Sequence, residues 1–292
     1  MIIQGSITAL ITPFKNGAVD EKAFRALVDW QIKEGTQALV PCGTTGESPA
    51  LSHEEHHRVV DICIEAAARR VPVIAGTGSN STQEAISLTR HAKKAGADAA
   101  LIVSPYYNKP TQEGLYQHFK AIAEAVELPI IVYNIPPRCV VDISVETMAR
   151  IAKLPNVIGV KEATGDVTRF TKHRRAIGKD FLQLSGDDAL ALAQMAHGGN
   201  GCISVTSNIA PRLLADFQAA CLSGDYVKAR SLHDRLAPLH EALFVETSPA
   251  PVKYAASLLG LCEPTVRLPL VEPQAATKQR VREAMVGAGL LN

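Results

Sequence analysis

The sequence predicts an α/β fold, a (β/α)8 TIM barrel followed by a C-terminal helical extension. Short apolar runs recur up to about residue 205, and each is followed by a segment with helical periodicity. Successive runs start about 20 to 34 residues apart, which is the size of one strand–helix unit. Beyond about residue 225 the strand pattern stops. We therefore expect the barrel in residues 1–224 and a helical region in residues 225–292.

Eight apolar runs are the candidate strands. They are nearly continuously apolar rather than alternating, as expected for parallel strands that are covered on both faces. They lie at 6–11, 38–41, 72–76, 99–104, 129–133, 157–161, 181–185 and 201–205. An open doubly wound sheet is the alternative architecture, but such a sheet rarely needs eight units of such even length, so the barrel is favoured.

Local helix signals support the segments between these runs. Ser52 with Glu55, and Ser81 with Glu84, have the spacing of a capping box, and Pro211 suits a first helical turn. Glycines stand where three helices should end, since glycine readily adopts the left-handed cap conformation; they are Gly35, Gly96 and Gly178. The C-terminal region predicts helices near 225–244, 249–261 and 276–291, packed on the barrel or on a partner subunit.

Composition narrows the class of protein. Of the 292 residues, 47% are hydrophobic, so a sizeable core is expected and disorder is not. Lys and Arg number 30 against 29 Asp and Glu, which argues against a nucleic-acid or anionic membrane partner. The six cysteines form no C-x-x-C pair, and we find neither a signal peptide nor an apolar run of about 20 residues. We expect a cytoplasmic protein with reduced thiols.

Two local motifs are best explained without a cofactor. Residues 53–57 match H-E-x-x-H, but they follow a cap at Ser52, so the glutamates simply suit the first helical turn. Residues 76–81 resemble a dinucleotide-binding turn with Asp98 downstream, but Ser81 replaces its third glycine. A barrel turn with a serine cap explains this segment equally well.

Two residues at neighbouring strand ends have the chemistry of a covalent site. Lys161 ends the run VIGVK, and a lysine there is often only a solvated charge. At the mouth of a closed barrel, however, desolvation would lower the lysine pKa and favour the nucleophilic neutral amine. Tyr133 ends the preceding run, PIIVY, and is either a core aromatic or a proton donor and acceptor beside the lysine.

Other polar residues follow the remaining strands, and each has a purely structural alternative. Thr44 and Thr45 lie in a glycine-rich turn, and Tyr106 and Tyr107 follow the fourth run as possible surface or interface aromatics. Arg138 is either an ordinary loop cation or a fork of donors for a carboxylate. We interpret Asp187 and Asp188, after the seventh run, as helix N-caps.

These residues belong to an ordered set of motifs with a known pattern. The motifs are GTTGE at 43–47, SPYYNKP at 104–110, YNIPPR at 133–138, GVKEATGD at 159–166 and LSGDD at 184–188. The set resembles the dihydrodipicolinate synthase family, within the N-acetylneuraminate lyase superfamily of pyruvate-dependent aldolases. The resemblance covers nearly the whole chain. Arg138, Thr44 and Tyr107 favour the synthases over the sugar-acid lyases, whereas Cys139 departs from the usual threonine.

The resemblance implies a function and a role for each matching residue. Pyruvate would condense with L-aspartate 4-semialdehyde to give 4-hydroxy-tetrahydrodipicolinate, the first committed step of diaminopimelate and lysine biosynthesis. Lys161 would form a Schiff base with pyruvate, without a metal or organic cofactor. Tyr133, Thr44 and Tyr107 would relay protons, with Tyr107 supplied by a neighbouring subunit. Thr45 and the Ile203 backbone would hold the pyruvate carboxylate, and Arg138 the carboxylate of the second substrate.

The resemblance further implies an assembly and a regulator. Members of the family are expected to be homotetramers built as a dimer of dimers, and some bind L-lysine at a subunit interface. The positions that match this lysine site are Ser48, His53, His56, Asn80, Glu84 and Tyr106. Pro49 departs from a familiar alanine. The alternatives are a lyase for sialic or 2-keto-3-deoxy sugar acids, or a silent barrel that serves only as a binding module, against which Lys161 and Tyr133 argue.

Overall fold

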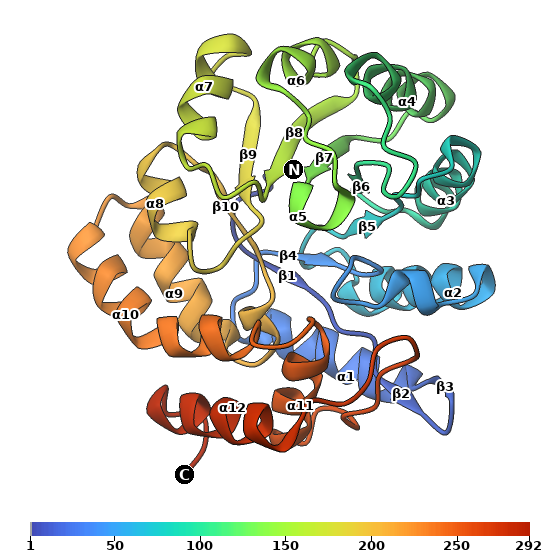
Figure 1. Cartoon of the computed structure of the whole chain (residues 1–292). Coiled ribbons are helices and arrows are strands. Elements are labelled where there is room, and N and C mark those ends of the chain that lie inside the picture. Colours follow the sequence, from blue (N-terminus) through green and yellow to red (C-terminus); the bar gives the residue numbers. More distant parts are fainter. Residues whose placement is uncertain (1) are drawn as a thin grey trace.

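The computed structural model describes residues 2–292 and confirms the barrel (Figure 1). The eight parallel strands found in these residues are hydrogen-bonded in the order β4-β1-β10-β9-β8-β7-β6-β5, and a bridge between Leu39 and Val73 joins the two ends of that order. The strands are β1 (Gly5–Ala9), β4 (Ala38–Val40), β5 (Ile74–Gly76), β6 (Ala99–Val103), β7 (Ile130–Asn134), β8 (Val157–Glu162), β9 (Leu182–Ser185) and β10 (Gly201–Ser204).

Helices surround this barrel and follow its strands in turn (Figure 1). They are α1 (Glu21–Lys33), α2 (His53–Ala67), α3 (Thr82–Ala95), α4 (Gln112–Ala125), α6 (Val145–Ile151), α7 (Thr168–Ala176), α8 (Ala191–Ala196) and α9 (Pro211–Leu222). Shorter helices lie in the loops after the strands: η1 (Ser48–Ala50), α5 (Pro136–Cys139) and η2 (Thr206–Asn208). Each predicted strand is therefore present, and the loops that carry the candidate site residues all follow strand ends.

The apolar runs are continuous because each strand is covered on both faces. Side chains on one face fill the barrel interior, including Ile7, Leu101 and Ile131. Side chains on the other face, including Val132 and Val160, pack against the surrounding helices. Removing both sets from water provides the main driving force for closing the barrel.

The predicted helix signals are largely confirmed. Ser52 forms a complete capping box with Glu55, and Gly96 caps α3 at a φ of +96°. Ser81 accepts the Glu84 amide, but the Glu84 side chain bonds to Ser79 instead of returning to the helix start. The second capping box is therefore only half formed, which leaves the Glu84 carboxylate beside the loops of the barrel mouth.

A small hairpin, β2 (Phe14–Lys15) and β3 (Ala18–Val19), is missing from the sequence prediction. Its turn consists of Asn16 and Gly17, both with positive φ, as two-residue hairpin turns require. The Asn-Gly pair was the available signal. The strands have only two residues each, so no alternating pattern accompanied it.

The C-terminal region consists of α10 (Tyr226–Ala242), α11 (Ala250–Leu258) and α12 (Ala275–Gly287), as the sequence predicts. Helix α10 packs against α9, and α12 packs against both α10 and α11 on one side of the barrel (Figure 1). These helices share one hydrophobic cluster with the helix layer of the barrel. None of the helices in residues 2–292 combines the length and the apolar character that crossing a membrane requires.

Candidate active site

Lys161 and Tyr133 lie side by side at the carboxyl ends of adjacent strands. They are register partners in the pairing of β8 with β7. The Lys161 Nζ lies 4.1 Å from the centroid of the Tyr133 ring. Both side chains are buried, and Tyr133 belongs to the cluster that fills the barrel interior. The predicted neighbours are therefore brought together inside the barrel mouth.

The surroundings of Lys161 favour its neutral, nucleophilic form. Burial lowers the pKa of the amine from 10.5 to about 8, while the nearby Cys202 and Asp188 oppose that shift. Gly186 provides the space, because a Cβ added there would lie 3.2 Å from Lys161 Cε and 2.8 Å from Ala163 Cβ. A pKa near 8 leaves about a tenth of the amine uncharged at pH 7, which suffices for attack on a ketone.

Tyr133 keeps its proton over the physiological range. Burial raises the pKa of its hydroxyl, and the nearby Arg138 only partly opposes this effect. A neutral phenol can donate its proton to a nearby oxygen and accept one back. Tyr133 thus has the protonation state that an acid–base group beside Lys161 needs.

The loop 43–47, between β4 and η1, brings the predicted threonines to the same mouth. Thr45 is buried, and Thr44 lies on the wall of a cleft of about 370 Å³. The Thr12 hydroxyl fixes the loop by donating a hydrogen bond of 2.7 Å to the Gly46 carbonyl. Ile203 lies near the end of β10 and is buried in the same interior cluster.

Glu47 ends this loop in an ion pair that the sequence did not reveal. Its Oε1 accepts a 2.7 Å hydrogen bond from Lys253 Nζ on α11, and neither side chain is exposed to solvent. Its Oε2 accepts the Arg267 backbone amide at 2.9 Å. The Lys253 amine and the Arg267 guanidinium both lie against the Phe14 ring, 4.1 and 4.2 Å from its centroid. The C-terminal region therefore holds the loop that carries Thr44 and Thr45.

Arg138 extends from the short helix α5 at the rim of the cleft. Pro136 and Pro137 begin this helix, which suits the fixed backbone angle of proline. The guanidinium is exposed, and its Nη2 donates to the Ser248 carbonyl at 3.3 Å. Cys139, the departure from the usual threonine, is buried and its thiol donates 3.3 Å to the Ser104 carbonyl. The substitution leaves Arg138 facing the same cleft as Thr44.

The cleft also contains most of the residues predicted to bind lysine. Its walls include Ser48, His53, His56, Glu84 and Tyr106. His53 Nε2 lies 2.8 Å from Glu84 Oε1, and hydrogen bonds from Ser79 and His53 hold the Glu84 pKa below its usual value. Asn80 lies outside the walls, where its carbonyl accepts from Asn108. The structure therefore brings five of the six positions to one cleft.

Two histidines of the segment 53–57, His53 and His56, have different partners, and His57, which completes the H-E-x-x-H motif, stacks on the His91 ring with 3.8 Å between centroids. His53 pairs with Glu84, whereas His56 Nε2 lies 2.9 Å from the Gly76 carbonyl. Burial lowers the pKa of His56 to about 4, so this ring stays neutral at physiological pH. The side chains of His53 and His56 are therefore engaged within the cleft wall, whereas His57 lies outside it.

Tyr107 is the predicted relay residue that the single chain does not bring to Lys161. It is 90% exposed and has a positive φ of 71°, in the loop after β6. It is not among the residues that line the cleft. Its predicted role depends on a neighbouring subunit and stays a prediction.

Asp188 differs from its predicted role. Asp187 accepts the Ala189 amide just before α8, close to the expected capping role. The prediction that Asp188 also caps this helix is wrong, because its Oδ2 accepts the amides of Val205 and Thr206 after β10. Asp188 is buried and fixes the backbone directly after Ser204, so it joins the β9 and β10 loops below the site.

Comparisons with known proteins agree with this geometry. The model of the Dihydrodipicolinate synthetase family matches residues 2–287. Curated 4-hydroxy-tetrahydrodipicolinate synthases of Bradyrhizobium diazoefficiens and Rhodospirillum centenum are 63% and 64% identical, over 99% of this chain and 98% and 100% of theirs. A chloride-inhibited dihydrodipicolinate synthase from Acinetobacter baumannii, solved with pyruvate, superposes with a TM-score of 0.97 at 49% identity, over 99% of this chain and 100% of that chain. A lysine-bound one from Cyanidioschyzon merolae has a TM-score of 0.95 at 42% identity, over 99% of both.

Proposed function

Since the chain belongs to the dihydrodipicolinate synthetase family, we propose that it condenses pyruvate with L-aspartate 4-semialdehyde to form 4-hydroxy-tetrahydrodipicolinate. This lyase reaction opens the diaminopimelate route to lysine. The observation that carries the proposal is the pair of buried side chains at the barrel mouth, the Lys161 amine with a pKa near 8 and the Tyr133 ring 4.1 Å from it.

The reaction begins when the neutral Lys161 amine attacks the ketone carbon of pyruvate. Loss of water from the resulting carbinolamine gives an imine between Lys161 and pyruvate. The protonated imine withdraws electrons, so a methyl proton leaves and an enamine forms. The enamine carbon then attacks the aldehyde of the second substrate. The amino group of that substrate displaces Lys161, which closes the ring and frees the enzyme.

The proton transfers are assigned to Tyr133, whose raised pKa keeps it a donor until a base accepts its proton. Thr44 of the loop 43–47 connects Tyr133 to Tyr107, and Tyr107 comes from a neighbouring subunit. The 90% exposure of Tyr107 in one chain supports this assignment, because a tyrosine that works within its own chain would be covered. The active enzyme is accordingly a homo-oligomer, and the resemblance to the family implies a tetramer built from two dimers.

Substrate carboxylates are held at two places in the mouth. Thr45 and the Ile203 backbone bind the carboxylate of pyruvate close to Lys161, where both are buried. Arg138 binds the carboxylate of L-aspartate 4-semialdehyde at the exposed rim, where a planar fork of donors suits a carboxylate. The division explains why one anion site is deep and the other is open to the cleft.

Borohydride trapping tests the proposal. Pyruvate with borohydride should leave a reduced adduct on Lys161, detected by peptide mass spectrometry, and Lys161→Ala should abolish it. Lys253 is a matched internal control, because it is also buried but is ion-paired with Glu47. An adduct on Lys253, or none, would exclude the mechanism. A coupled assay then separates L-aspartate 4-semialdehyde from sialic and 2-keto-3-deoxy sugar acids, and preference for a sugar acid would assign the chain to the lyases.

The same cleft suggests regulation by the pathway's end product. We propose that L-lysine binds between subunits at Ser48, His53, His56, Asn80, Glu84 and Tyr106. The Glu84 carboxylate would pair with the ammonium of the ligand, and Tyr106 would cover its methylene chain. The solved relative with lysine bound supports this reading.

The free cysteines suit a cytoplasmic location.

A further inference from the structure

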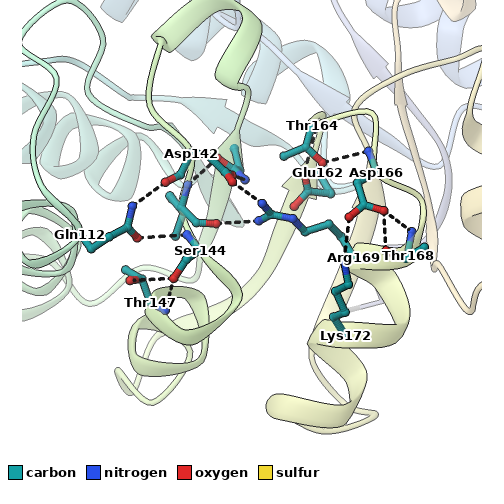
Figure 2. Close-up of polar contacts among 12 residues, drawn as sticks. Gln112, Asp142, Ser144, Thr147, Glu162, Thr164, Asp166, Thr168, Arg169 and Lys172 are labelled. Atoms are coloured by element: carbon teal, nitrogen blue, oxygen red, sulfur yellow. Dashed lines mark hydrogen bonds and ion pairs between the residues drawn. The ribbon is translucent and has the colours of Figure 1, made fainter.

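A polar network lies behind the catalytic strand ends, on the side that faces the helices (Figure 2). Asn134 follows Tyr133, and Glu162 follows Lys161, in register with one another across β7 and β8. Side chains alternate along a strand, so Asn134 and Glu162 face away from the barrel interior. Both are fully buried. The reaction scheme above uses neither of them.

Asn134 closes the loop that carries Arg138. Its Nδ2 donates a hydrogen bond of 2.9 Å to Asp142 Oδ1, and its Oδ1 accepts a hydrogen bond of 3.2 Å from the Ile143 amide. One side chain at the end of β7 therefore bonds both to a side chain and to the backbone at the far end of loop 135–143. The two ends of this loop are held together by a single buried amide.

Two neighbouring helices hold the same far end of the loop (Figure 2). Arg169 on α7 donates a hydrogen bond of 2.7 Å from Nη1 to the Ile143 carbonyl, and its Nη2 forms an ion pair with Asp142 Oδ2. Gln112 on α4 donates 2.7 Å to the Asp142 carbonyl and accepts the Ser144 amide at 3.0 Å. The base of loop 135–143 is therefore fixed from β7, α4 and α7 at once.

Arg138 itself is held much less. Its guanidinium makes the single 3.3 Å hydrogen bond to Ser248 and is otherwise exposed to the cleft. A long side chain with one weak contact depends on its backbone for its position. Misplacing a binding group by about 1 Å can lower a rate by about 100-fold. The place of Arg138 is therefore set by whatever fixes loop 135–143.

We propose that Asn134, Asp142 and Arg169 form a latch that positions Arg138 for the carboxylate of the second substrate. The three act through Arg138 and touch neither Lys161 nor pyruvate, so they are positioning residues that determine which aldehyde the enamine accepts. The inference rests on the proposed function. It goes beyond that function by assigning substrate selection to residues outside the cleft.

The variant Arg169→Met removes the guanidinium from Asp142 and from the Ile143 carbonyl and keeps an unbranched side chain on α7. We expect the KM for L-aspartate 4-semialdehyde to rise about 10- to 100-fold. Without the latch, the Arg138 guanidinium would spend most of its time away from the position that binds the substrate carboxylate. The yield of the borohydride-trapped pyruvate adduct and the KM for pyruvate should stay within about twofold of wild type, because Lys161 is held by β8.

Lys172→Met is the matched control. Lys172 lies on the same helix α7 and pairs with Asp166 at 2.9 Å, away from loop 135–143 (Figure 2). The variant removes one positive charge, as Arg169→Met does. Lys172→Met should leave the KM values for pyruvate and for L-aspartate 4-semialdehyde unchanged. Asp142→Asn removes the charge that Arg169 meets and one of the two carboxylate acceptors, so it should raise the KM for L-aspartate 4-semialdehyde and leave the KM for pyruvate within about twofold of wild type, as Arg169→Met does. Equal effects of Lys172→Met and Arg169→Met would overturn the latch.

A double-mutant cycle separates positioning from a general structural role. In an Arg138→Ala background the second-substrate KM should already be high, and adding Arg169→Met should change it by less than about twofold, because the latch has nothing left to position. Fully additive effects, or an equal loss of pyruvate trapping in Arg169→Met, would refute the proposal. Absence of any pyruvate adduct in wild type would overturn the latch together with the proposed function, whereas an adduct with additive variants would overturn the latch alone.

Discussion

Lys161 combines two properties that a folded protein normally keeps apart, burial and charge. The buried amine lies over the Tyr133 ring, and Gly186 leaves space beside its side chain. Its pKa falls from 10.5 to about 8, so at neutral pH most of the amine carries a charge in a poorly solvated place. The reactivity of Lys161 is therefore obtained at a cost in stability, as is common for active sites.

Lys161→Met should stabilise the protein at neutral pH. The lowered pKa corresponds to about 3 kcal/mol of unfavourable charging in the folded state. For a lysine with a lowered pKa, this penalty is complete below about pH 8 and is lost as the pH rises toward 10.5. Urea unfolding across this range should therefore show a gain for the variant at pH 7 that disappears near pH 10.5. A gain that does not change with pH would contradict this account of the Lys161 environment.

At the scale of elements, the loop 43–47 is held by a segment far along the chain. The Glu47 carboxylate is fully buried, and the Lys253 amine on α11 and the Arg267 backbone amide satisfy its two oxygens. Breaking a buried pair on one side leaves an uncompensated charge, whereas removing both charges does not. The stability of the loop thus depends on the pair being complete.

Lys253→Met should lower the free energy of unfolding by about 3–5 kcal/mol, because Glu47 would stay buried without its cation. The double variant Glu47→Gln/Lys253→Met should recover much of that loss, since the carboxylate is replaced by a neutral amide of similar shape. Urea unfolding of both variants at pH 7 provides the measurement. A single variant that costs less than about 1 kcal/mol would show that the pair is not what holds the loop.

The elements that the sequence predicted are those whose signals are local. The strands were found because each is apolar on both faces, and Lys161 and Tyr133 because they end such strands. The role of Asp188 is not predictable from local signals, because its partners, Val205 and Thr206, lie after a different strand. The Glu47–Lys253 pair joins residues 206 positions apart and has no local pattern. Contacts that depend on the closed barrel are the part that a single sequence does not reveal.

At the scale of the whole molecule, one cleft joins the proposed catalytic and regulatory residues. Thr44 and Arg138 share its walls with His53, Glu84 and Tyr106. Tyr106 is followed directly by Tyr107, which is exposed in the single chain. A ligand in this cleft would lie beside both the loop 43–47 and the residue that we assign to the neighbouring subunit, which is a direct route for coupling two sites.

L-Lysine should inhibit the enzyme, and Glu84→Ala should weaken that inhibition strongly, because the ligand's ammonium would lose its carboxylate. Initial rates titrated with lysine up to millimolar concentrations provide the measurement. Glu54→Ala is the control. This substitution removes the same charge from the nearby start of α2, but Glu54 is not part of the cleft wall. A flat titration for wild type would refute the site, and equal weakening by both variants would reduce it to a general charge effect.

Tyr107→Phe should lower kcat by about 100-fold, the usual contribution of one acid–base group, while leaving the assembly intact because only a hydroxyl is removed. Sedimentation velocity and steady-state rates measured on the same samples test both parts. Wild-type activity per chain should also fall when dilution dissociates the oligomer. Full activity of a dissociated wild-type chain would show that Tyr107 is not shared between subunits.

The distance along the chain between Glu47 and Lys253 also imposes an order of events during synthesis. At roughly 5–20 residues per second, the ribosome needs on the order of 10–40 s to add the 206 residues that separate them. Through that interval the loop 43–47 has been synthesised, but the cation that pairs with its carboxylate does not yet exist. Glu47 must therefore remain hydrated until α11 is made. The mouth of the barrel is completed only after α11 has been made, however early its strands have paired.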